Sequence, residues 1–181
     1  MWFAYIVGFL ALTVGIYMSV VLHDPHFYSP FSIGLTLISL QFYKKVFGQS
    51  LFHNWKTRQH IYFWILLVIA CLITDQIGMH LNLWHYPYYA GFIDEAIKLT
   101  LEYAVPFVYF LAIYLSTKKL LGFTAAALIV IPLTLIFTEY INSFSDSWVV
   151  TMPMVIWYTV GAWLMTLIPW CVHRAIKKLT H

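Results

Sequence analysis

Charged residues are scarce in this chain. Only 9% of its 181 residues are charged and 62% are hydrophobic, whereas soluble domains carry roughly a quarter charged residues. The apolar residues also form long runs, and a run of about 20 residues is long enough to cross the hydrocarbon core of a bilayer. The composition therefore excludes an ordinary soluble domain and predicts an integral membrane protein.

Cysteines and the motifs of common enzyme classes are scarce as well. The two cysteines, Cys71 and Cys171, lie far apart and have no spacing typical of a disulfide framework or a zinc site. The sequence has no Gly-rich phosphate loop, no G-x-S-x-G elbow and no acidic diphosphate motif. These absences argue against kinases, hydrolases and diphosphate-ionising synthases. We expect neither a cofactor nor a nucleic-acid partner.

The apolar runs predict an all-α, polytopic transmembrane helix bundle that forms a single domain over residues 1–181. The first run lacks the basic region and cleavage site of a signal peptide, so it is expected to be a retained helix. The second run is short and contains Ser29 and Pro30. It could therefore be an interfacial or re-entrant segment, and the chain would then have five spans. We prefer six and find no convincing internal repeat. The predicted spans are residues 2–22, 27–43, 61–79, 96–116, 120–141 and 149–172.

The basic residues predict the orientation, because short cytoplasmic loops carry the excess of Lys and Arg. Six spans place nine of the ten on one side, and only Lys98 falls on the other. Both termini and the connection from Lys44 to His60 are then cytoplasmic. We expect the membrane to be the cell membrane. The nine residues are Lys44, Lys45, Lys56, Arg58, Lys118, Lys119, Arg174, Lys177 and Lys178.

The acidic residues collect on the opposite, outer side. Asp75, Glu102 and Glu139 lie inside apolar runs, where an ionisable side chain costs a few kcal/mol or more and usually faces the bundle interior. Three carboxyls at one depth would repel one another, so one would stay protonated near neutral pH and could act as a Brønsted acid. In the alternative interpretation, Lys98 neutralises Glu102 on one helix face, and the other two acids reach water at the interface.

Histidines and aromatic residues share this outer layer. His23 and His26, with Asp24 or the loop acids, could hold a borderline metal, but interfacial histidines without a metal are the preferred interpretation. Trp84 and Tyr86 are typical of the aromatic belt at a membrane interface. Alternatively, their ring faces could stabilise a carbocation.

Residues 75–110 resemble the membrane-embedded lycopene cyclases of the heterodimeric bacterial and fusion fungal type. The match consists of Asp75, the loop Leu-Trp-His-Tyr-Pro at 83–87, and Glu-Tyr-Ala-Val-Pro-Phe at 102–107 followed by Phe110. The family's Pro-x-Glu-Glu is reduced here to one Glu, with the proline after it. The whole chain is also similar to uncharacterised small polytopic membrane proteins of spore-forming Gram-positive bacteria, which implies a fold but no activity.

The cyclase resemblance implies non-redox acid catalysis on a lipophilic isoprenoid. It implies Glu102 as the acid, Asp75 and Glu139 as its partner or base, and the rings of Trp84 and Tyr86 as walls that stabilise a cation. The candidate substrate contacts are Trp84, Tyr86, Tyr103, His80 and His85.

Two other classes remain open. Intramembrane acids also form proton or cation relays, and Pro106 and Pro132 could open a site in a small transporter, which would need to form an oligomer. Alternatively, the chain is a non-catalytic signalling or assembly subunit whose acids pair with another chain. The basic connection 44–60 would then dock a partner, although contact with anionic lipid is the simpler interpretation.

Overall fold

The computed structural model describes residues 2–87, 104–146 and 148–179, and this part of the chain is almost entirely helical. The all-α prediction is confirmed, apart from two strands of two residues each. The elements are α1 (Trp2–Val20), η1 (Pro25–Phe27), α2 (Tyr28–Phe47), α3 (Thr57–His80), β1 (Trp84–His85), α5 (Ala104–Leu121), α6 (Phe123–Ala125), η2 (Ala126–Val130), α7 (Ile131–Asn142), β2 (Val149–Val150), α8 (Met154–Ile156), η3 (Trp157–Gly161) and α9 (Ala162–Leu179).

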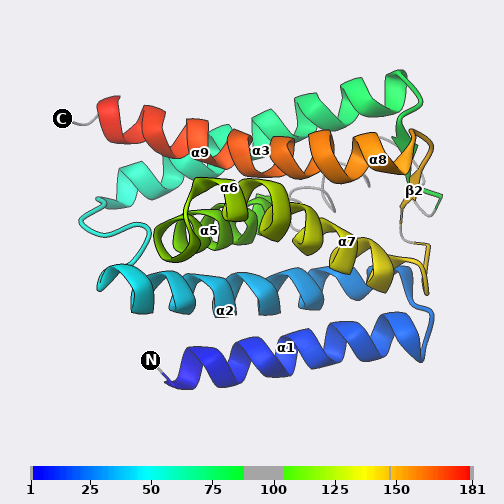
Figure 1. Ribbon diagram of the computed structural model, residues 1–181, viewed down its shortest axis with the longest axis horizontal. Helices are drawn as coiled ribbons and strands as arrows, with labels where there is room; N and C mark the ends of the chain where they lie inside the picture. The colour runs from blue at the N-terminus through cyan, green and yellow to red at the C-terminus, as the bar shows by residue number, and fades with distance from the viewer. Residues whose placement is uncertain (1, 88–103, 147, 180–181) are drawn as a thin grey trace.

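The helices lie roughly side by side along the long axis of the molecule (Figure 1). α1 and α2 form an antiparallel pair at one edge, α5 and α7 lie in the middle, and α3 and α9 form the opposite edge. The short elements α6 and η2 continue into α7, and α8 and η3 continue into α9. Both η2 and η3 are π-helical turns, which are rare and often occur at functional sites.

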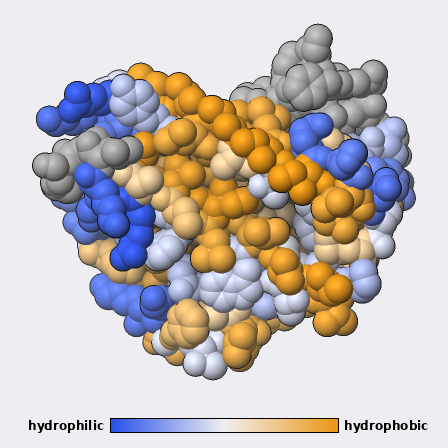
Figure 2. Space-filling view, turned by 90° about the horizontal axis from the view of Figure 1, so that it is seen from above, coloured by the Kyte–Doolittle hydropathy of each residue, from blue (hydrophilic) through white to orange (hydrophobic). Residues whose placement is uncertain are grey.

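Within the residues that the structure describes, four helical stretches are long and apolar enough to cross a membrane, fewer than the six predicted spans. These are Trp2–Val20, Thr57–His80, Phe123–Asn142 and Met154–Lys178. In Figure 2 an apolar band separates hydrophilic side chains at the two ends of the molecule. This distribution is the one that a bilayer requires of a protein surface.

The second predicted span forms a continuous helix of 20 residues, α2. At 1.5 Å per residue it is about 30 Å long, the thickness of the hydrocarbon core. Pro30 lies in its first turn, where backbone N–H groups have no partner within the helix, so the proline does not break it. Ser29 and Pro30, which raised the re-entrant alternative, therefore lie at the start of a continuous helix. This helix is less apolar than the four stretches above.

Glycines bring α1 and α2 into close contact. A Cβ added at Gly15 would lie 2.5 Å from the backbone nitrogen of Phe31, and one added at Gly34 would overlap the backbone of Leu12. Small residues of this kind let helix backbones approach each other in membrane proteins, where packing takes over much of the role of the hydrophobic effect.

Charges separate along the long axis. Lysines occupy the last turns of α2, α5 and α9, and Lys119 from α5 donates to the carbonyl of Val46 in α2 over 2.9 Å. Figure 1 places the ends of α2 and α9 and both chain termini at one end of the bundle. The described acids Asp24, Asp75, Glu139 and Asp146 lie on or beside the opposite ends of α1, α3 and α7.

Candidate functional site

The site begins where the chain reverses direction at the end of α3. Asn82 adopts a left-handed conformation with φ of 53°, which Asn tolerates better than most residues. The reversal directs the following strand back along the helix, and the ring of Trp84 lies over Gly78. A Cβ at position 78 would overlap that ring, so this glycine makes the contact possible.

Asp75 is buried at this end of α3, with 5% of its surface exposed. Its Oδ1 accepts a hydrogen bond from the indole Nε1 of Trp84 at 2.9 Å and another from the hydroxyl of Tyr86 at 2.6 Å. Hydrogen bonds to a buried carboxyl group offset the cost of removing it from water. Asp75 and the loop after α3 therefore hold each other in place.

Glu139 is bound in a similar way at the end of α7. Its Oε1 accepts hydrogen bonds from the indoles of Trp148 at 2.8 Å and Trp157 at 2.7 Å, and 8% of its surface is exposed. The side chain of Asn142 also donates to the carbonyl of Trp148 over 2.8 Å. Trp157 comes from the π-helical turn η3, so this carboxyl group connects the end of α7 to the start of the last long helix.

The two acid sites have the same local design. Trp84 follows Asp75 by nine residues, and Trp148 follows Glu139 by nine. Seven residues after each acid, Asn82 and Asp146 have positive φ angles of 53° and 49°. The chain thus repeats a unit in which a helix ends, turns sharply and returns a tryptophan to its own carboxyl group.

The strands that follow the two acids pair with each other in a symmetric register. β1 and β2 are antiparallel, with Trp84 opposite Val150 and His85 opposite Val149. His85 and Val149 each lie ten residues after their acid, so this register relates the two units by a local twofold axis. These two short units are a local exception to the prediction that the chain has no convincing internal repeat. In the sequence the two units share only the spacings D-x8-W and E-x8-W. A pattern of two residues is too short to be distinguished from chance in a chain with eight tryptophans.

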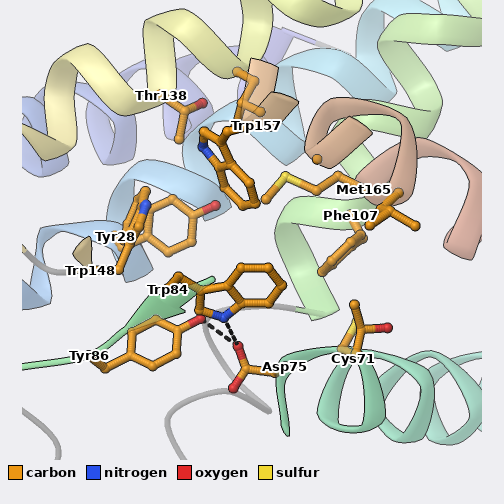
Figure 3. Close-up of a pocket in the computed structure, with 14 residues that line it drawn as sticks. Tyr28, Cys71, Asp75, Trp84, Tyr86, Phe107, Thr138, Trp148, Trp157 and Met165 are labelled. Atoms are coloured by element: carbon orange, nitrogen blue, oxygen red, sulfur yellow. Dashed lines mark hydrogen bonds between the residues drawn. The ribbon is translucent and has the colours of Figure 1, made fainter. Parts of the chain in front are cut away.

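A cavity of about 40 Å³ lies between Asp75 and the middle of the bundle. Trp84 and Trp157 meet at its wall with 5.5 Å between ring centroids, and the labelled side chains of Figure 3 converge on the same space. Aromatic rings and apolar side chains form most of its surface. The described lining residues are Tyr28, Cys71, Thr74, Asp75, Trp84, Tyr86, Phe107, Leu135, Thr138, Trp148, Trp157, Gly161, Leu164 and Met165.

The predicted catalytic acids are not all placed on this cavity. Asp75 lines it, whereas Glu139 is not among the lining residues and contacts the cavity walls Trp148 and Trp157 through its hydrogen bonds. Glu102 lies outside the described residues. Asp75 is therefore the predicted catalytic acid that the structure places at the cavity.

The predicted substrate contacts divide in the same way. Trp84 and Tyr86 line the cavity and bind Asp75. His80 and His85 are exposed and do not line it, and Tyr103 lies outside the described residues.

Trp157 and Tyr28 are cavity residues that the sequence did not single out. Trp157 lies in the middle of an apolar run, where an indole is ordinarily a packing residue, and no short-range pattern connects it to Glu139. Tyr28 comes from the start of α2 and stacks edge-on against Trp148, with 4.8 Å between ring centroids. Both contacts join elements far apart in sequence.

Metal ligation is not supported by the described part of the chain, where no group of three His, Cys, Asp or Glu side chains is arranged to hold an ion. His23 instead makes a 2.6 Å hydrogen bond between its Nδ1 and the carbonyl of Phe144, and Asp24 accepts from the backbone nitrogen of His26. These residues join and cap the ends of helices.

No known protein family, no curated protein and no solved structure matches the chain with significant similarity.

Proposed function

We propose that the protein crosses the cell membrane six times, with both termini and the connection 44–60 in the cytoplasm. Four apolar stretches of sufficient length, the 20-residue α2 and the 18-residue α5 support six spans. The lysines at the ends of α2, α5 and α9 support a cytoplasmic location for that end of the bundle. Asp75 and its cavity then lie near the outer surface.

For the activity, we propose acid catalysis on an isoprenoid alkene, with Asp75 as the acid. The observation that carries this proposal is a buried carboxyl group at the wall of a cavity formed by aromatic rings. A carboxylic acid placed against an alkene in a site that excludes water can act as a general acid. Aromatic ring faces attract a cation without reacting with it. This combination suits a reaction that begins with a proton and continues through a carbocation.

The proposed reaction needs no oxidant or reductant. The protonated Asp75 transfers its proton to a terminal double bond, which leaves a tertiary carbocation on the neighbouring carbon. The next double bond attacks that carbon and closes a ring, and the rings of Trp84 and Trp157 stabilise the cation. A second carboxylate removes a proton from the carbon next to the new cationic centre. For this step we propose Glu102, which the cyclase resemblance instead implied as the acid. The product is an isomer of the substrate.

The size of the cavity places a condition on this proposal. Most pockets for small molecules measure roughly 300 to 1,000 Å³, whereas this cavity is about 40 Å³. The end of an isoprenoid chain must therefore move the aromatic walls apart as it enters from the bilayer. The small residue Gly161, which contacts the ring of Trp157, lies at the wall that would move.

The test is expression of the Asp75→Asn variant in a strain that accumulates lycopene or another prenyl substrate. Asparagine keeps the size of the side chain and its acceptor oxygen but cannot supply the proton. Cyclised product should form with the parent protein and be lost in the variant. Asp24→Asn, at the same end of the bundle and outside the cavity, is the matched control. The cyclase proposal fails if the parent protein forms no product, or if Asp75→Asn forms as much as the control.

A second candidate function is ion-coupled transport, and the repeated acid and tryptophan unit is the observation that favours it. Many transporters consist of related halves with the binding site between them, and here the symmetric β1 and β2 pairing lies between the two units. Proton or divalent-cation flux into proteoliposomes, abolished by Glu139→Gln, would support this function over the cyclase.

A further inference from the structure

Glu139 lines a second hollow, which shares the wall residue Trp148 with the Asp75 cavity. This groove has a volume of about 390 Å³, which is within the range of pockets that bind small molecules. It runs along the end of α7 and the start of the last long helix. Its floor carries Glu139, its rim carries Asp146, and its sides include the rings of Tyr140, Trp148 and Tyr158.

The charge of the groove has one sign. Glu139 and Asp146 are both acidic, and no Lys, Arg or His is among the described residues that line it. Glu139 is held rigidly by the indoles of Trp148 and Trp157. Acidic side chains and neighbouring aromatic rings both attract an organic ammonium group.

The groove opens toward the apolar surface of the bundle. Its lining residues Tyr140, Met154 and Ile136 have 61%, 49% and 40% of their surfaces exposed, and they belong to helices long and apolar enough to span the membrane. Asp146 follows the end of α7 and is exposed at the polar end of the molecule. An occupant would thus meet carboxylates at one end and hydrocarbon at the other.

We propose that this groove binds a single-chain ammonium amphiphile from the outer leaflet. The cationic head lies between Glu139 and Asp146 against the aromatic rings, and the hydrocarbon chain follows Ile136 and Met154 into the bilayer. The charge complementarity and the opening onto the apolar surface together select this occupant over a free anion, a sugar or a soluble cation. The choice of the outer leaflet rests on the proposed orientation of the six spans. Binding itself does not depend on the cyclase proposal, because it concerns another hollow and requires no reaction.

The test measures binding to the full chain in maltoside detergent, with the ionic decyl probes kept below their micelle concentrations. Decyltrimethylammonium, decyl sulfate, decanol and tetramethylammonium are titrated while the unfolding temperature is recorded, because a ligand that binds the folded state raises it. We expect decyltrimethylammonium to raise the unfolding temperature in a saturable way. The other three probes lack either the positive charge or the hydrocarbon chain, and they should not raise the unfolding temperature.

Two variants locate the site. Asp146→Asn keeps a residue that tolerates the left-handed backbone, and it should weaken decyltrimethylammonium binding about two- to five-fold, the range of an exposed ionic contact. Glu139→Gln keeps a hydrogen-bond acceptor for the two indoles and should weaken binding about ten-fold or more, because its carboxylate is buried. Asp24→Asn removes the same charge outside the groove and should bind as the parent does.

The proposal is overturned if decyl sulfate, decanol or tetramethylammonium stabilises the protein as well as decyltrimethylammonium does. It is also overturned if neither groove variant weakens binding, or if Asp24→Asn weakens it equally. Since Asp146 is exposed, its variant tests the site even if Glu139→Gln prevents folding. The cyclisation assay with Asp75→Asn gives an independent readout, so the failure of one proposal is distinguishable from the failure of the other.

Discussion

The indoles of Trp84 and Trp157 meet at a tilted angle of 47°, with 5.5 Å between their ring centroids, and each donates a hydrogen bond to a different buried carboxyl group. The Asp75 and Glu139 units are therefore in contact through their tryptophans. A substitution that breaks the hydrogen bond of one indole should therefore also shift the position of the other indole.

The first prediction concerns the hydrogen bond between Trp84 and Asp75. Trp84→Phe keeps an aromatic ring but removes the indole N–H, which leaves the buried carboxyl group with one donor fewer. We expect a loss of about 1–3 kcal/mol in the free energy of unfolding, measured by denaturant titration in detergent. Trp2→Phe, at a tryptophan that is 76% exposed, should change it by less than about 0.5 kcal/mol. An equal effect of the two variants would contradict the structural role of this bond.

The second prediction concerns the glycine beneath Trp84. Gly78→Ala places a methyl group where the indole ring lies, so the ring must move away from Asp75. We expect a destabilisation of about 1–3 kcal/mol, the usual cost of overpacking.

A double-mutant cycle identifies the cause of that cost. In a Trp84→Ala background the ring is absent, and Gly78→Ala should then cost close to nothing, or even stabilise α3 slightly because alanine favours helices. If the cost is the same in both backgrounds, the contact between Gly78 and Trp84 is not its origin.

The third prediction ranks the glycines between α1 and α2. The Cβ of Gly15→Ala would meet backbone atoms of Phe31 at 2.5 to 2.7 Å, whereas at Gly8 the nearest atom is the side-chain Cγ1 of Ile38 at 3.0 Å. A side chain can move more easily than a backbone, so Gly15→Ala should lower the unfolding temperature more than Gly8→Ala does. The reverse order would indicate that the two helices pack differently.

The fourth prediction tests the proposed six-span topology. In a variant with Cys71 and Cys171 replaced, single cysteines are introduced at the exposed positions Gln49, in the connection 44–60, and Ser143, after α7. A maleimide that cannot cross membranes should label Ser143→Cys in intact cells and Gln49→Cys only after the membrane is opened. Labelling of both positions in intact cells would rule out this orientation.

The sequence by itself determined the class of fold. Hydropathy alone predicts where long helices occur, because the cost of placing polar groups in hydrocarbon is large and local. It also predicted that Asp75 and Glu139 lie near the same end of the bundle. The second helix was uncertain because its apolar run is short and contains Ser29 and Pro30, and these two residues begin a helix instead.

The tertiary structure alone decided which residues meet. The partners of Glu139 and the pairing of β1 with β2 depend on how helices pack, and side-chain contacts of that kind have no period in the sequence. It also decided that Asp75 lines an aromatic cavity while Glu139 lines a separate groove. The two acids nevertheless lie near the same end of the bundle, and each accepts a hydrogen bond from the tryptophan nine residues after it. The scarcity of charge thus predicts a membrane protein, and the packing of its helices gives Asp75 and Glu139 different surroundings.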